Sequence, residues 1–212
     1  MLDILCLIVS DLAPVRFITK PLLIVLLIIF YLLQNKDLTV QKSWLMTIAL
    51  SCFLIANTLT LFRFKTMFVL ASVFFILAKA FYAFRFANNR DFNLLASLPF
   101  IVSYVIYMLI ILQLTMPNLG DSLITILMFL FVTLMAFQFA FLRKGDVSHQ
   151  SYLFVLIGMF LLLLADTSSV LSAFYKRFQY QWIVTMLLYG FSQYLIVVGL
   201  IKERDPVSSK AF

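Results

Sequence analysis

The stretch YLFVLIGMFLLLLADTSSVLSAFY, from Tyr152 to Tyr175, decides the fold of this chain. It is longer than the roughly 20 apolar residues that a helix needs to cross a bilayer, and its one charged residue is Asp166, near the centre. A carboxylate at that depth costs a few kcal/mol on insertion scales, so such residues usually face the protein interior and mark functional sites. The stretch therefore predicts a transmembrane helix that turns Asp166 toward other helices.

The rest of the composition agrees with a membrane protein that crosses the bilayer several times. Of 212 residues, 64% are hydrophobic and 12% are charged, against about 45 to 50% and about 25% in soluble domains. We predict an all-α membrane protein, a polytopic bundle of seven clear transmembrane helices within a single domain over residues 1–212. The predicted spans, joined by short polar turns, are Ile18–Gln34, Trp44–Phe62, Met67–Phe86, Leu94–Leu114, Leu123–Leu142, Tyr152–Tyr175 and Tyr180–Ile201.

The first residues, Met1 to Pro14, predict a short additional helix. Asp3 stands where a signal peptide would carry basic residues, and Asp11 ends the apolar stretch after about a dozen residues. We expect this segment to be interfacial or half-inserted, or to be the remainder of a first span.

The positive charge of the chain serves topology. The net charge is +7, but Lys and Arg stand at the ends of apolar runs, where they reach headgroups, and this pattern argues against nucleic-acid binding. If the spans alternate, the loops on the side of the C-terminus hold more basic residues. This predicts a cytoplasmic C-terminus, with the protein in the cytoplasmic (inner) membrane.

Several polar side chains fall at membrane depth. Measured from the face where Lys20 would enter, Asn57 lies roughly 9 Å deep, Asp166 and Tyr189 roughly 14 Å, and Lys79 and Gln193 roughly 20 Å. A shared site is one interpretation. Alternatively, Lys79 extends to the far headgroups, the uncharged side chains only join helices by hydrogen bonds, and Asp166 forms a purely structural ion pair.

Other chemistry is missing from the sequence. His149 is the single histidine and lies in a turn at the membrane edge, so a histidine-based metal site or catalytic triad is excluded. No nucleophile elbow, zinc motif or phosphate-binding glycine loop occurs. We expect neither a metal nor another cofactor.

Five stretches in collinear order resemble the lysoplasmalogenase (YhhN-like) family of membrane proteins, and together they cover nearly the whole chain. They are ITKPLLIVLL (Ile18–Leu27), IALSCFLIANTLTLF (Ile48–Phe62), FFILAKAFY (Phe74–Tyr82), IGMFLLLLADTSSVLSAF (Ile157–Phe174) and LLYGFSQYLIVVG (Leu187–Gly199). The resemblance implies an eight-helix membrane bundle. For the function, it implies hydrolysis of the vinyl-ether bond of lysoplasmalogens to a fatty aldehyde and a glycerophospho head group.

The resemblance also assigns residues. Asp166 stands at the second family aspartate and Lys20 begins the family's Lys-Pro pair, whereas Asn57 replaces the first aspartate and Lys79 replaces a histidine. The catalytic candidates are therefore Asp166, Lys79 and Asn57. The candidates for binding substrate are Lys20, Tyr82, Tyr189 and Gln193, with Lys20 placed to meet the head-group phosphate.

Vinyl-ether hydrolysis needs an acid that protonates carbon, a carboxylate that stabilises the cation, and a base for water. Either Asp166 is the acid, or a desolvated Lys79 is the acid and Asp166 serves as base or cation stabiliser. The alternative function is a catalytically impaired relative that binds lysophospholipids or organises membrane lipids, which the Asn57 and Lys79 replacements favour. A small transporter is disfavoured because the chain shows no internal repeat.

Overall fold

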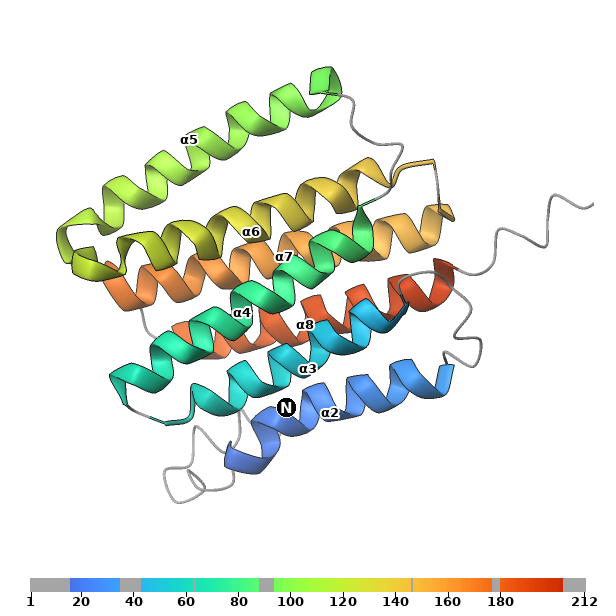
Figure 1. The fold of residues 1–212 in the computed structure, drawn as a ribbon, viewed down its shortest axis with the longest axis horizontal. Helices are drawn as coiled ribbons and strands as arrows, with labels where there is room; N and C mark the ends of the chain where they lie inside the picture. Colours follow the sequence, from blue (N-terminus) through green and yellow to red (C-terminus); the bar gives the residue numbers. More distant parts are fainter. Residues whose placement is uncertain are drawn as a thin grey trace, which may run out of the picture. The chain divides into compact units, whose positions relative to one another are not determined.

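Seven α-helices make up the described part of this computed structural model, which comprises residues 16–34, 43–62, 64–87, 94–145, 147–176 and 180–203 (Figure 1). Each predicted span is helical. The helices are α2 (Arg16–Gln34), α3 (Ser43–Leu59), α4 (Lys65–Phe86), α5 (Leu94–Leu119), α6 (Leu123–Leu142), α7 (His149–Phe174) and α8 (Gln181–Ile201). The largest difference is at α5, which ends at Leu119 rather than Leu114. The short helix predicted before Pro14 lies outside the described residues.

Four of these helices, α4, α6, α7 and α8, are long and apolar enough to cross a membrane. The apolar stretches of α2, α3 and α5 are shorter: Pro21–Gln34, Trp44–Leu59 and Val102–Pro117. At about 1.5 Å per residue, α3 spans roughly 26 Å, less than the roughly 30 Å of bilayer hydrocarbon. The described part of the chain is thus all-helical with four helices that could cross a membrane, and the predicted seven clear spans are not confirmed.

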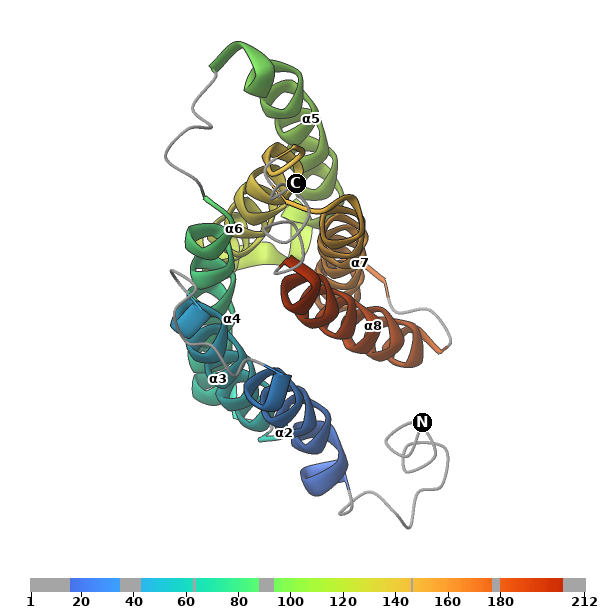
Figure 2. The same ribbon diagram turned by 90° about the vertical axis from the view of Figure 1, so that its right-hand side faces the viewer.

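The chain divides into two compact units, and the first, Met1–Arg85, contains α2, α3 and most of α4. Within it, α3 lies between α2 and α4 (Figure 2). Phe53 of α3 fills the contact with α4, because its ring centre is 6.0 Å from that of Phe75 and 5.3 Å from that of Tyr82. Both Phe53 and Tyr82 are fully buried. A single aromatic side chain thereby fixes how α3 and α4 face each other.

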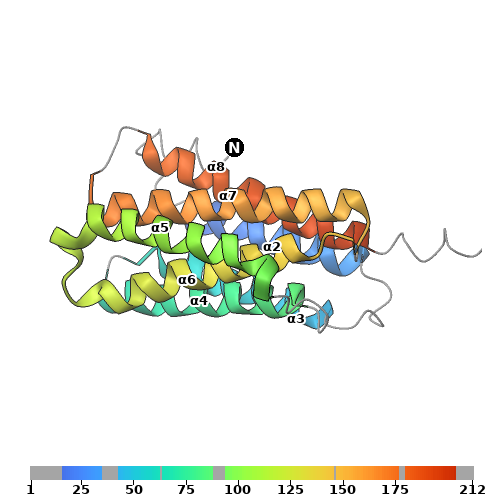
Figure 3. The same cartoon turned by 90° about the horizontal axis from the view of Figure 1, so that it is seen from above.

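The second unit, Phe86–Phe212, is organised around α7, which contacts α5, α6 and α8 (Figure 3). A 3-10 turn, η2 (Gly120–Ser122), joins α5 to α6, and Gly120 adopts a φ of +47° that side chains disfavour. Apolar side chains fill the contact of α5, α6 and α7, namely Ile111, Ile126, Leu130 and Val170.

Helices α7 and α8 pack closely along a seam in the second unit, where two positions are glycines and carry no side chain. A Cβ on Gly158 would lie 2.8 Å from Ile196 Cγ1 and 3.0 Å from the Ser192 carbonyl oxygen. A Cβ on Gly199 would lie 2.7 Å from Val155 Cγ2. Small residues let membrane helices approach this closely, so the glycines set the register of the pair.

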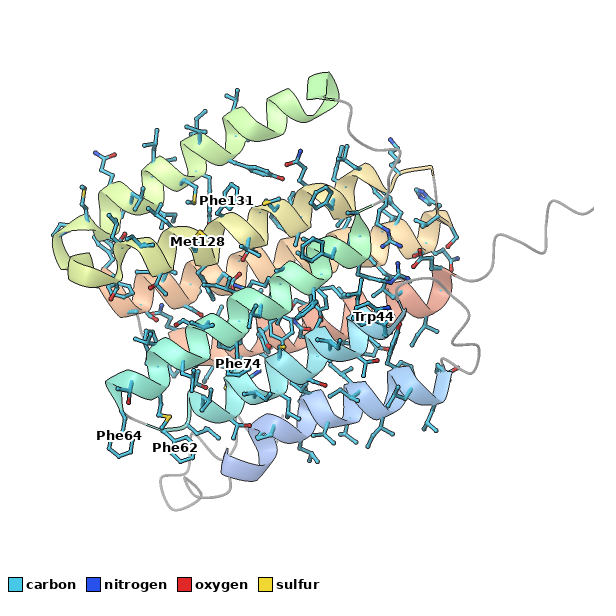
Figure 4. The ribbon with its side chains drawn as sticks, in the orientation of Figure 1. Trp44, Phe62, Phe64, Phe74, Met128 and Phe131 are labelled. Carbon is cyan, nitrogen blue, oxygen red and sulfur yellow. The ribbon has the colours of Figure 1, made fainter. Side chains whose placement is uncertain are left out.

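Aromatic residues stand at both ends of α3. Trp44 is near its start, and Phe62 and Phe64 lie in the turn that follows its end (Figure 4). All three are exposed, Phe64 by 68%. Phe131 and Met128 of α6 are also about half exposed, at 52% and 48%. These exposed apolar side chains fit a lipid-facing surface.

Candidate functional site

The residues predicted for the site are distributed over both units. The first unit holds Lys20, Asn57, Lys79 and Tyr82, and the second holds Asp166, Tyr189 and Gln193. Lys20 belongs to α2 and directly precedes Pro21, which lies inside that helix.

Asp166 is buried in α7 and faces α6 rather than lipid, as its position in the sequence predicts. It is 5% exposed, and Thr133 of α6 donates a hydrogen bond to its Oδ2 across 2.8 Å. Thr133 is itself fully buried, and its Oγ1 also lies 2.9 Å from the carbonyl oxygen of Phe129, one turn earlier in α6. Asp166 is therefore held by a hydroxyl that has two acceptors within reach.

The two residues after Asp166 tie α7 to its other neighbours. The Thr167 hydroxyl lies 2.5 Å from the Tyr107 hydroxyl of α5, and the Ser168 hydroxyl lies 2.7 Å from that of Thr185 in α8. Successive residues of an α-helix project about 100° apart, so three consecutive side chains reach α6, α5 and α8. Asp166 thus stands at the level where α7 is bonded to every other helix of its unit.

The contacts between α7 and α8 show how Tyr189 and Gln193 lie relative to Asp166. The two helices run antiparallel, with Ser168 beside Thr185 and Gly158 beside Ser192 and Ile196, so Asp166, two residues before Ser168, is level with about Leu187. Tyr189 is then about 3 Å and Gln193 about 9 Å beyond that level.

Asp166 and Tyr189 thus lie within about 3 Å of one level, close to the equal depth that the sequence predicts. At the start of α8, Gln181 donates from Nε2 to the Ser168 carbonyl across 2.6 Å, and this bond holds the first residue of α8 against α7. Gln193 is fully buried, and the Ser192 hydroxyl beside it donates to the Tyr189 carbonyl across 2.7 Å.

In the first unit, Asn57 and Tyr82 both contact Phe53. Asn57 is 5% exposed and donates from Nδ2 to the Phe53 carbonyl across 2.9 Å, while the Phe53 ring packs on Tyr82. Lys79 precedes Tyr82 by one turn of α4 and is fully buried. This burial argues against the interpretation that Lys79 extends to the headgroups.

Thr133 is the residue that the sequence analysis missed, although a signal was present. It is the sole polar residue among the buried positions of α6, a helix that is described throughout. It lies ten positions after the start of α6, and Asp166 lies eight positions before the end of α7. Because α6 and α7 run antiparallel, the start of α6 and the end of α7 lie at the same end of the unit. Measured from that end, Thr133 lies about 15 Å along α6 and Asp166 about 12 Å along α7, close enough for their side chains to meet.

The side chains of the described residues form no cluster of metal ligands. Within the described ranges, no three side chains of His, Cys, Asp or Glu lie close enough together to hold an ion. Asp166 accepts a bond from a neutral hydroxyl, that of Thr133.

Comparison with known proteins identifies a family. A sequence model of the YhhN family matches residues 15–200, which include α2 to α7 and nearly all of α8. No curated protein and no solved structure shows significant similarity to the chain.

Proposed function

Because the chain belongs to the YhhN family, we propose that it is a membrane hydrolase of the lysoplasmalogenase type. Its substrate is a lysophospholipid with one vinyl-ether chain, and its products are a fatty aldehyde and a glycerophospho head group. The observation that carries the proposal is Asp166, a buried carboxyl at the centre of a membrane helix with a hydroxyl partner. An asparagine would accept the same bond without the cost of a charge, so a carboxyl in this place favours proton chemistry.

One carboxyl suffices for the reaction if it acts twice. Asp166 gives its proton to the vinyl carbon that is not bonded to oxygen, which leaves an oxocarbenium ion beside the new carboxylate. Water then adds to the carbon that bears the oxygen, and its proton passes to Asp166. The resulting hemiacetal breaks into the aldehyde and the head-group alcohol, and Asp166 is again protonated.

The other predicted residues assist in this scheme. Lys79 and Asn57 are proposed as the remaining catalytic groups, which orient water and carry protons to or from it. Tyr82, Tyr189 and Gln193 bind the substrate, and Lys20 binds the phosphate of its head group. Membrane lipids are the surroundings from which the substrate enters.

The proposal extends to the architecture. We propose that all seven helices cross the bilayer and that residues 1–14 add a short eighth helix, as the family resemblance implies. The basic residues of the loops support a cytoplasmic C-terminus, and we propose that the protein lies in the inner membrane.

A second candidate function is lipid binding without hydrolysis, and Asn57 is the residue that favours it. Its side-chain amide donates to the Phe53 carbonyl, a bond that the aspartate of the family pattern would not make when ionised. The bond fits a residue that has become structural. The chain would then be a lipid-binding or membrane-organising relative.

The test uses purified full-length protein in vesicles, with lysoplasmalogen and the ester lysophospholipid of the same head group as substrates. We expect release of fatty aldehyde from the vinyl ether, and a loss of at least about 100-fold in Asp166→Asn. Thermal unfolding of the variant serves as the folding control. Turnover that survives Asp166→Asn would refute the assigned site.

The same assay decides on the second candidate. Absence of turnover with both lipids, together with saturable binding of a saturated-ether analogue, would replace the hydrolase by the lipid-binding relative. Absence of both turnover and binding would refute both candidates.

A further inference from the structure

We infer that Thr133 is the positioning residue of Asp166, because its hydroxyl suits both protonation states of that carboxyl. The inference rests on the proposed function and adds a residue from α6, a helix to which the sequence assigned no role. Thr133 is fully buried, as is the stretch of α6 that faces α7.

The hydroxyl hydrogen of Thr133 has two possible acceptors. The Thr133 Oγ1 lies 2.8 Å from Asp166 Oδ2 and 2.9 Å from the Phe129 carbonyl oxygen. A threonine hydroxyl carries a single hydrogen and two lone pairs. It therefore donates to one of these oxygens at a time, or divides its hydrogen between them.

Each arrangement matches one state of the carboxyl. When Asp166 is ionised, Thr133 donates to Oδ2 and stabilises the negative charge. When Oδ2 carries a proton, Thr133 turns its hydrogen to the Phe129 carbonyl and accepts the proton of Asp166 on a lone pair. The Thr133 hydroxyl turns about its C–O bond, and no other atom has to move.

A carboxyl that acts as acid and then as base benefits from such a partner. If Thr133 could bond to only one of the two states, its hydrogen bond with Asp166 would be lost in the other. The hydroxyl removes this imbalance and keeps the carboxyl in place through the cycle. A valine, which has nearly the same shape, would do neither.

The first arm of the test does not depend on turnover. Infrared spectra of the full-length protein in lipid, labelled with carbon-13 aspartate, identify the carboxyl band of Asp166 as the band that Asp166→Asn removes. We expect Thr133→Val to shift this band, and Thr133→Ser to restore its position. Ser168→Ala, which removes a hydroxyl two positions from Asp166 on the same helix, should leave it unchanged. An unshifted band in Thr133→Val would overturn the inference.

The second arm measures kinetics on lysoplasmalogen. We expect kcat to fall about 10- to 100-fold in Thr133→Val with KM within about twofold, and to recover in Thr133→Ser. Ser168→Ala should keep the wild-type kcat. Should the valine variant fail to fold, Thr133→Cys replaces it, because its thiol is a weaker donor and should give intermediate values in both arms.

The two arms separate the inference from the proposed function. If the wild type releases no aldehyde, the hydrolase proposal fails, and the infrared band alone decides whether Thr133 positions Asp166. If the wild type turns over and Thr133→Val keeps its kcat, the inference fails and the hydrolase stands.

Discussion

At the scale of the residue, Asp166 and Asn57 are both buried but form different hydrogen bonds. Asp166 accepts a bond from Thr133 of the neighbouring helix α6. Asn57 donates within its own helix, to the Phe53 carbonyl. In our proposal Asp166 carries the proton of the reaction, so a substitution there changes the chemistry, whereas a substitution of Asn57 also removes a local bond.

We expect Asn57→Asp to increase aldehyde release, by about 10-fold, because a second carboxylate can activate water while Asp166 protonates carbon. The same change should lower stability by about 1–3 kcal/mol, since a carboxylate cannot donate to the Phe53 carbonyl. Aldehyde release and thermal unfolding measure the two effects. Asn57→Ala is the matched control, because it removes the bond without adding a carboxyl, and equal activities of the two variants would contradict this prediction.

At the scale of the element, α7 is the helix on which the second unit depends. Asp166, Thr167 and Ser168 bond to α6, α5 and α8, and the glycine seam brings α7 and α8 into close contact. The Ser151 hydroxyl adds a bond of 2.7 Å to the Gly199 carbonyl at the far end of the same seam. The register of α8 on α7 is thus fixed at both ends.

We expect Gly158→Ala to destabilise the protein by about 1–3 kcal/mol, the range for overpacking. Alanine would otherwise gain about 1 kcal/mol over glycine in a helix, so a loss isolates the steric effect. The new Cβ would meet the Ile196 amide nitrogen and the Ser192 carbonyl at 3.0 Å, and backbone atoms cannot turn aside as a side chain can. Leu164→Ala, on the exposed side of α7, is the control in thermal unfolding. Equal stability of Gly158→Ala and the wild type would show that the seam can open.

The helices were predictable and the individual contacts between them were not, for physical reasons. Apolar runs bounded by polar turns identify helices because an apolar segment of that length has few other stable states in lipid. The packing of α8 on α7 depends on Gln181 reaching the Ser168 carbonyl and on Gly158 admitting Ile196, and neither contact has a signature in a single sequence. Thr133 was missed because a threonine in a membrane helix usually bonds to its own backbone. Thr133 does so too, in addition to its contact with Asp166.

At the scale of the whole molecule, charged side chains mark one end of the second unit. Arg143 after α6 pairs with Glu203 after α8 at 2.8 Å, and Lys202 donates to Gln150 of α7 across 3.2 Å. The ends of these helices therefore share one polar face, where a bilayer would end. The basic residues of this face are those that predict a cytoplasmic C-terminus.

We expect a fluorescent protein fused to the C-terminus to be bright, and a periplasmic phosphatase fused there to be inactive, in a bacterial host. The reason is the excess of Lys and Arg in the loops on this side, which stay in the cytoplasm. Fusions after Lys144, in the turn between α6 and α7, should behave alike, because both sites lie at the same end of the second unit. An active phosphatase at the C-terminus would show that the topology is the opposite of the predicted one. Opposite results at the two fusion sites would show that the ends of α6 and α8 do not lie on the same side of the membrane.

The charge of Lys79 provides a test within the first unit. Lys79 is fully buried, and a buried ammonium is unfavourable unless it is compensated. We expect Lys79→Met to cost about 3–5 kcal/mol in thermal or detergent unfolding, because it leaves the group that compensates the ammonium buried without its partner. Lys79→Arg is the control that keeps the charge. An unchanged stability of Lys79→Met would show that this position does not depend on a charge, and Lys79 would then have to be removed from the catalytic scheme while Asp166 and Thr133 stay within it.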